Sequence, residues 1–255
     1  MKLSLLDSDM HGFTLVELMV ALVISSIIVT GIYSAYTSQQ RINQAQDQIV
    51  EIQQTLRAGL DMIARELRMA GFDPDGNEDV GFKATDIDDN SSTNATSVTF
   101  TMRVDGDGRD NDNDGERDEE DEYTNTGSGD VTQISYFLRD AYNDGTIDLV
   151  RKVDSGSSIA LIENVDNVEF CYILKNGESR LSPTFQELSD IRSVKISVLV
   201  RSSGISLNYT DTISYSPASS SDTLLSSLTT WNSGPFNDSF RRRMQIITVD
   251  CRNIF

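Results

Sequence analysis

The chain has 255 residues, of which 38% are hydrophobic, and a formal net charge of −19 from 40 acidic and 21 basic residues. This hydrophobic content is sufficient for a folded core, so disorder of the whole chain is not expected. The strong negative charge argues against nucleic acid as a partner, because phosphate binding needs a clustered positive surface.

The first 36 residues consist of a polar segment followed by an apolar one. Residues 1–12 read MKLSLLDSDMHG, and the only ionisable side chain of residues 13–36 before the tyrosines is Glu17. As a helix, residues 13–36 would be about 36 Å long, enough to cross the hydrocarbon core of a bilayer. A carboxylate within such a segment is costly and predicts a functional role with a cationic partner.

Gly12 is a small residue placed before the apolar segment, whereas a secretory signal peptide has its cleavage site after it. Cleavage after Gly12 would leave the apolar segment on the mature protein and create an amine at Phe13. This amine would lie one helical turn from Glu17, or would pair with Glu17 of a neighbouring subunit and so favour one axial offset between subunits. The alternative is a plain single-pass anchor whose Glu17 lies near the membrane interface.

Residues 37–71 continue the helix as an amphipathic segment, with apolar residues at steps of three and four. Gly71, followed by Pro74, is its predicted end. A helix over residues 13–70 would be about 87 Å long, so we expect its first half to pack against other subunits. Gly59 and the strand-like sequence after Gly71 favour packing of the second half on a sheet over a free coiled-coil stalk.

Residues 72–255 show the two-residue alternation of β-strands. Short links without a helical pattern imply antiparallel pairing, and Asn143-Asp144-Gly145 is a predicted turn. Residues 216–238 are rich in Ser, Asn and Thr and predict a surface loop with one short helix around 224–228. The predicted fold class is α+β, a long N-terminal helix packed on a C-terminal antiparallel β-sheet domain. The predicted strands are 97–104, 131–139, 147–153, 165–174, 193–201, 205–215 and 244–250.

An acidic insertion, residues 105–122, separates the first two predicted strands and reads DGDGRDNDNDGERDEEDE. Oxygen ligands at alternate positions followed by Gly115 match the first half of a calcium loop. Asp121 stands where an EF-hand has Glu, so the pattern is closer to the loops of dockerin and thrombospondin-type repeats. We therefore expect Ca²⁺ here, and the alternative is a solvated acidic loop without an ion. The candidate ligands are Asp110, Asp112, Asp114, Glu116, Asp118 and Asp121, with Asp105 and Asp107 as less favoured additions.

Cys171 and Cys251 are the only cysteines, and His11 is the only histidine, so a zinc site is not expected. In an oxidising compartment the two cysteines could form one disulfide. The alternative is two inert cysteines within strands.

Arginines 241–243 form the one basic cluster of the sequence. As a functional site this cluster would contact DNA or a partner protein. We interpret it instead as the solvated entry to the last strand, because three arginines give little attraction within so acidic a chain.

GFTLVELMVALVISSIIV resembles the prepilin N-terminal motif of type IV pilins and type II secretion pseudopilins. The segments ARELRMAGFDP, ISYFL, DLVRK, LIENVDNVEFCYI and VDCRNIF are similar to the PilW-like minor pilins and the J-type pseudopilins. The resemblance thus covers most of the chain. It implies cleavage after Gly12 by a membrane prepilin peptidase, N-methylation of Phe13, and a role for Glu17 in assembly.

The function that this resemblance implies is that of a minor type IV pilin, which is incorporated into a pilus or primes its assembly. Before assembly the protein would be a single-pass inner-membrane protein with a periplasmic domain. Its partners would be other pilins and the prepilin peptidase/N-methyltransferase. One alternative is a J-type minor pseudopilin of a type II secretion system, and an alternative of another class is a membrane-anchored calcium-binding adhesin that never polymerises. Catalysis is not expected, because His11 would leave with the leader and the sequence has no glycine-rich phosphate loop.

Overall fold

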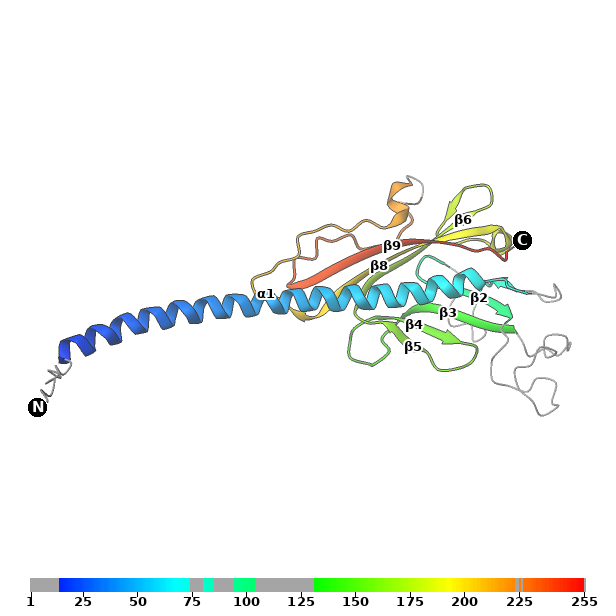
Figure 1. Ribbon diagram of the computed structural model, residues 1–255. Coiled ribbons are helices and arrows are strands. Elements are labelled where there is room, and N and C mark those ends of the chain that lie inside the picture. Colours follow the sequence, from blue (N-terminus) through cyan, green and yellow to red (C-terminus); the bar gives the residue numbers. More distant parts are fainter. Residues whose placement is uncertain are drawn as a thin grey trace, which may run out of the picture. The chain divides into compact units, whose positions relative to one another are not determined.

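The structure is a computed structural model of the chain (Figure 1), and it describes residues 14–73, 80–84, 94–103, 131–222, 225 and 227–254. The chain divides into two compact units, residues 1–47 and 48–255. The described part of the first unit, residues 14–47, is Thr14 and the N-terminal part of helix α1 (Leu15–Met69). The second unit combines residues 48–69 of α1 with two antiparallel sheets.

Helix α1 ends where the sequence predicts it to end. Gly71 has a φ of 75°, the left-handed conformation that glycine adopts just after a helix, and its N–H donates to the Thr101 carbonyl. At the other end, every side chain over residues 14–36 is exposed within the chain. An 18-residue window of α1 has a mean hydropathy of 2.4 with none of it buried, so the helix is long and apolar enough to cross a membrane.

Residues 48–69 of α1 present an apolar stripe to the core of the second unit, at the three- and four-residue spacing of an amphipathic helix. Gly59 lies at the closest approach to the sheet, since a Cβ at this position would be 2.4 Å from Cγ1 of Ile162. This confirms the expected packing of the helix on a sheet. The buried residues of α1 are Ile52, Leu56, Gly59, Leu60, Ile63, Ala64 and Leu67.

Sheet A has the strand order β1-β2-β3-β4-β5, and every neighbouring pair is antiparallel. The predicted turn at Asn143-Asp144-Gly145 joins β3 to β4, with Asn143 and Gly145 at φ 57° and 83°. The strands are β1 (Gly81–Phe82), β2 (Val98–Arg103), β3 (Val131–Arg139), β4 (Asp148–Val153) and β5 (Ile159–Ile162).

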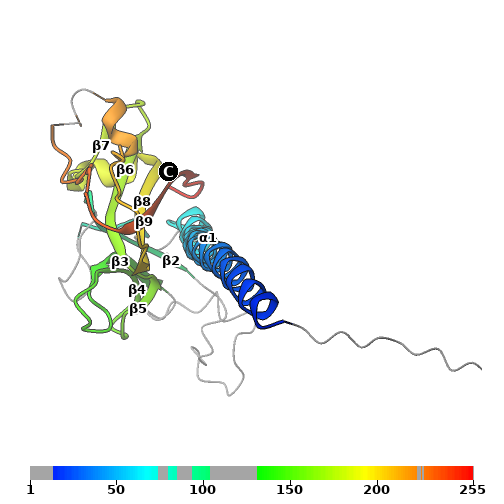
Figure 2. The ribbon, with the colours of Figure 1, turned by 90° about the vertical axis from the view of Figure 1, so that its left-hand side faces the viewer.

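Sheet B has the order β7-β6-β8-β9, also antiparallel, which leaves β9 as an edge strand. The strands are β6 (Val165–Leu174), β7 (Ser179–Arg180), β8 (Ile191–Ile205) and β9 (Phe240–Asp250). Figure 2 shows both sheets on the same side of the cyan part of α1, residues 48–69. One continuous core joins the helix to side chains of both sheets, including Phe100, Tyr136, Phe170 and Tyr172.

The second unit therefore contains two sheets within one domain. The chain crosses from sheet A to sheet B between β5 and β6, beside the fully buried Asp148. The Asp148 carboxylate accepts hydrogen bonds from the backbone N–H groups of Ala141 and Asn164, which compensates for its burial. β1, β5 and β7 were not predicted, because strands of two to four residues carry too little alternation to be recognised.

The predicted strand at 205–215 is wrong. Only Ile205 belongs to a strand, and residues 206–215 run as an irregular segment with sparse backbone hydrogen bonds to residues 233–239. The alternation of apolar residues in this stretch does not reflect a buried face, since Leu207 and Ile213 are 73% and 53% exposed. In the part of the loop that the structure describes, a 3₁₀ turn lies at Ala218–Ser221, before the helix expected around 224–228, where residues 224 and 226 lie outside the described residues.

Candidate assembly site

The N-terminus of α1 is closed by a reciprocal pair of hydrogen bonds between Thr14 and Glu17. The Thr14 N–H and Oγ1–H both donate to Oε2 of Glu17 over 2.9 Å, and the Glu17 N–H donates to Oγ1 of Thr14 over 3.2 Å. This arrangement is a capping box, which satisfies backbone donors that have no partner in the first helical turn. Glu17 thus has a local role that the sequence-based argument did not include.

The other oxygen of Glu17 is available to a partner. Among the described residues, nothing donates a hydrogen bond to Oε1, and the side chain is exposed. The apolar side chains that follow are exposed as well, for example Leu15 at 73% and Ile27 at 67%. A surface of this kind is stable in a bilayer or against other apolar helices rather than in water. One carboxylate within it can therefore take a cation from outside the chain.

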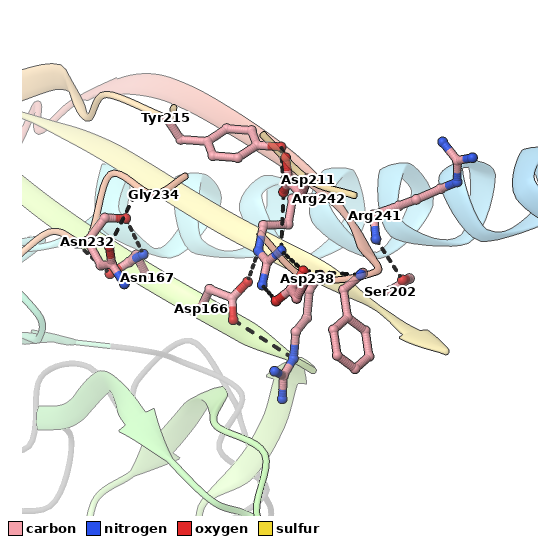
Figure 3. Close-up of polar contacts among 12 residues, drawn as sticks. Asp166, Asn167, Ser202, Asp211, Tyr215, Asn232, Gly234, Asp238, Arg241 and Arg242 are labelled. Carbon is pink, nitrogen blue, oxygen red and sulfur yellow. Dashed lines mark hydrogen bonds and ion pairs between the residues drawn. The ribbon is translucent and has the colours of Figure 1, made fainter. Parts of the chain in front are cut away.

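A second polar cluster, which we call the arginine cage, lies in sheet B and its covering loop (Figure 3). Arg242 of β9 donates from Nε to Asp166 over 2.6 Å and from Nη1 to Asp211 over 3.1 Å. Its Nη1 and Nη2 also donate to the two carboxylate oxygens of Asp238, over 2.6 and 2.7 Å. The guanidinium lies 3.8 Å from the ring centroid of Phe236.

The arginine cage holds its charges in a buried setting, because the side chains of Arg242 and Asp211 are 1% and 0% exposed. Burial disfavours the charged arginine, but its hydrogen bonds to Asp238 and Asp166 outweigh this effect and raise the pKa of Arg242. The more exposed Asp238 has its pKa lowered by the Arg242 hydrogen bonds. At Asp166 burial prevails over the same arginine and raises the pKa.

The arginine cage attaches the irregular loop, described over residues 206–222, 225 and 227–239, to the outer face of sheet B. The loop then contributes Trp231, whose indole N–H donates to the Tyr215 carbonyl over 2.8 Å. It also buries Ser219, which donates to the buried carboxylate of Glu169 over 2.8 Å. These contacts stabilise the loop, so we interpret the arginine cage as a structural cluster.

The comparison with protein-family models places a prokaryotic N-terminal methylation motif at residues 8–33. These residues include the capping box and the first turns of the exposed apolar helix. The chain therefore carries a prepilin-type N-terminal methylation motif.

Among solved structures, the chain is similar to a type IV-like pilin from Thermus thermophilus. The two share 16% identity, with 80% of this chain and 98% of that chain covered at a TM-score of 0.47. No curated protein matches the chain.

Two sets of predicted site residues lie outside the described residues. The first is the processing site, Gly12 and Phe13. The second is the candidate calcium loop, whose eight candidate ligands lie between Asp105 and Asp121. Within the described ranges, no group of three or more His, Cys, Asp or Glu side chains is arranged to hold a metal.

The disulfide considered between the two cysteines is absent from the structure. Cys171 and Cys251 are both buried and free. Cys251 belongs to the main core, whereas Cys171 packs with Leu181 and Leu225 in a small cluster on the other face of sheet B. Because the sheet separates the two side chains, a bond between them would require the strands to move. The alternative interpretation, two inert cysteines, agrees with this placement.

The interpretation of arginines 241–243 as solvated is wrong for the middle residue. Alternation along β9 puts Arg242 on the face covered by the loop, while Arg243 is exposed on the opposite face. Arg241 stacks on Tyr209, with 4.4 Å between the guanidinium carbon and the ring centroid. The sequence offered one signal, since three consecutive strand residues cannot share a face.

Proposed function

We propose that this protein is a minor type IV pilin of the PilW-like group. Prepilin peptidase cleaves it after Gly12, Phe13 is N-methylated, and the exposed apolar helix then packs among the helices of other pilins. Before assembly this helix anchors the protein in the inner membrane, with the second unit in the periplasm. The observation that supports the proposal best is the methylation motif on a helix whose apolar side chains are all exposed over residues 14–36.

Glu17 has a defined part in this proposal. Its Oε2 caps its own helix, and Oε1 accepts the N-terminal ammonium of a neighbouring subunit. A carboxylate without a cationic partner is costly within lipid. Subunits are therefore most stable at the one axial offset that brings Glu17 next to the neighbour's ammonium group. The protein's contribution is structural, and no catalytic step is assigned to it.

The proposal is tested by replacing Glu17 in the full-length protein expressed in its own host. We expect mass spectrometry to find a mature chain that begins with N-methylated Phe13. Glu17→Gln should retain the capping box in part but lose the charge, and should reduce the amount of protein in sheared filaments at least tenfold. The matched control is Glu51→Gln, an exposed carboxylate further along the same helix, which should leave incorporation unchanged.

Three outcomes would contradict the proposal. An intact leader on the working protein would favour the single-pass anchor, and undiminished incorporation of Glu17→Gln would remove the role of the charge. Co-purification with secretion components in place of pilus components would favour the J-type pseudopilin.

A further inference from the structure

β9 is an edge strand, and the backbone N–H and C=O groups along its outer side do not pair with another of the described strands. It pairs with β8 on one side only, and the Cys251 N–H donates to the Arg192 carbonyl at the end of this ladder. Alternate residues of an antiparallel ladder direct both backbone groups toward the partner strand. The register therefore points the backbone groups of Met244, Ile246 and Thr248 away from β8. In the part of the chain that the structure describes, these groups have no hydrogen-bond partner.

Between Met244 and Val249 this edge lacks the charged side chains, prolines and bulges that usually protect an edge strand. β9 has 11 residues, FRRRMQIITVD, without proline or glycine, and its ladder with β8 is regular from Arg201 to Ser193. Arg243, Ile246, Thr248 and Asp250 are exposed, and of these Ile246, at 46%, is apolar. A long regular edge of this kind is a template for the addition of another strand.

A groove borders the same edge. It has a volume of about 500 Å³ and lies between β9 and residues 48–69 of α1. Figure 1 shows β9 running alongside this part of the helix. The groove is lined by Val50, Gln53, Gln54, Arg57, Arg243, Met244 and Gln245.

The groove is positively charged although the chain carries a net charge of −19. Arg57 and Arg243 line it, and neither forms an ion pair with any carboxylate of the described residues. Asp61 lies one turn beyond Arg57 on the exposed side of α1. It is followed by Arg65 and Arg68, which form no ion pair with a carboxylate in the described part of the chain. The charges therefore favour an acidic occupant.

We propose that the free edge of β9 binds an extended acidic segment of a different pilin-like subunit, which adds to sheet B as a further strand. This inference rests on the proposed function, because packing of the apolar helices is what brings a neighbouring subunit beside β9. Main-chain hydrogen bonds to Met244, Ile246 and Thr248 hold the added strand, and Arg57 and Arg243 select acidic side chains within it.

The test uses a photo-crosslinking amino acid at Gln245, in the groove, in full-length protein in its own host. We expect a crosslink to another chain that carries an N-terminal methylation motif, within an acidic segment of that chain. The same amino acid at Ser157, in the exposed turn between β4 and β5, should give no such product.

Thr248→Pro is the decisive variant. It removes an outward N–H and leaves the hydrogen bonds between β8 and β9 intact, as proline does on edge strands. We expect it to reduce the crosslink at least tenfold, whereas Thr248→Ala, which retains the N–H, should not. A second variant, Arg57→Gln with Arg243→Gln, lies on the surface and keeps the test valid if the proline variant fails to fold. It should also weaken the crosslink, and raised salt should weaken it in the wild type.

Several results would overturn the inference. These are the absence of a crosslink at Gln245, a crosslink to a second copy of this chain, and a crosslink that persists in both Thr248→Pro and the double arginine variant. The state of Phe13 and the effect of Glu17→Gln are measured in the same strain. If Phe13 is methylated and Glu17→Gln reduces incorporation, but the crosslink is not found, only the strand-addition inference fails. If Phe13 is not methylated or Glu17→Gln has no effect, the proposed function fails as well.

Discussion

Arg242 donates to Asp211 over 3.1 Å where both side chains are almost inaccessible to water, at 1% and 0% exposure. The two residues are 31 positions apart, and their pairing attaches the loop that covers sheet B. A buried ion pair of this kind is a poor source of net stability, but the loss of one partner leaves the other charge buried and uncompensated.

Arg242→Met is therefore expected to lower the free energy of unfolding by about 3–5 kcal/mol, since Asp211 and Asp238 lose their cation and Asp166 keeps only Arg201, at 3.8 Å. Denaturant unfolding of the full chain in detergent, followed by the fluorescence of Trp231, measures this loss. Trp231 is the only tryptophan and lies within the attached loop. Arg243→Met, one residue away and exposed, is the control and should change stability by less than about 0.5 kcal/mol. Equal effects of the two variants would contradict a special role for Arg242.

The arginine cage also predicts a dependence of stability on pH. The pKa of Asp238 is lowered below its usual value of 3.8 by the Arg242 hydrogen bonds. The contribution of the Asp238 carboxylate to the free energy of unfolding is therefore complete above pH 3.8, and it is lost as the pH falls through the lowered pKa. Asp166 acts in the opposite sense because burial raises its pKa, so the effect of Asp238 must be isolated with Asp238→Asn. The difference in melting temperature between wild type and this variant should shrink as the pH falls from about 5 to below 3. A difference that stays constant over this range would contradict the assignment.

Gly59→Ala should destabilise the second unit, because its Cβ would overlap Cγ1 of Ile162 at 2.4 Å. We expect a loss of about 1–3 kcal/mol, the usual cost of overpacking, in spite of the better helix propensity of alanine. Denaturant unfolding measures the loss. The control is Gly31→Ala on the same helix, where a Cβ meets no atom within 4 Å, and which should cause no loss. A stabilised Gly59→Ala variant would show that the helix does not approach β5 this closely.

The two cysteines should be unreactive in the folded protein. Burial raises the pKa of Cys251 to about 12 and also raises the pKa of Cys171, so little thiolate exists at pH 8. Iodoacetamide at pH 8 should modify neither thiol in native protein and both after denaturation, without added reductant. Mass spectrometry distinguishes these states. Thiols that become reactive only after reduction would show a disulfide instead.

For the acidic insertion we propose calcium binding, on the sequence pattern alone. Calorimetric titration of the full chain in detergent should show heat on addition of Ca²⁺, with a Kd of about 10⁻⁴–10⁻³ M, and a rise in melting temperature. The double variant Asp110→Asn, Asp112→Asn should abolish both effects. Asp144→Asn is the matched control, since Asp144 lies in an acidic turn outside the insertion. The absence of calcium-dependent heat in the wild type would remove the proposal.

Local patterns in the sequence determined the helix and most of the strands. The apolar run over residues 13–36 and the three- and four-residue spacing after it predicted α1, because helical periodicity is a property of neighbouring residues. Gly71 marked the end of the helix, because the residue after a helix often has a left-handed φ, which glycine adopts without steric cost. β2, β3, β4, β6, β8 and β9 were each predicted within a few residues of their observed bounds. The functional hypothesis also came from the sequence, because the motif around Glu17 is contiguous.

Tertiary structure alone decided what depends on residues far apart in the chain. The partners of Arg242 lie 76, 31 and 4 positions away, and no local pattern indicates that they converge. The same limit applies to Cys171 and Cys251, because only the order of strands in sheet B puts them on opposite faces. The alternation at 205–215 was misleading for a related reason. A strand forms only where a neighbouring strand accepts its backbone hydrogen bonds, and the sequence does not state which neighbour the fold supplies.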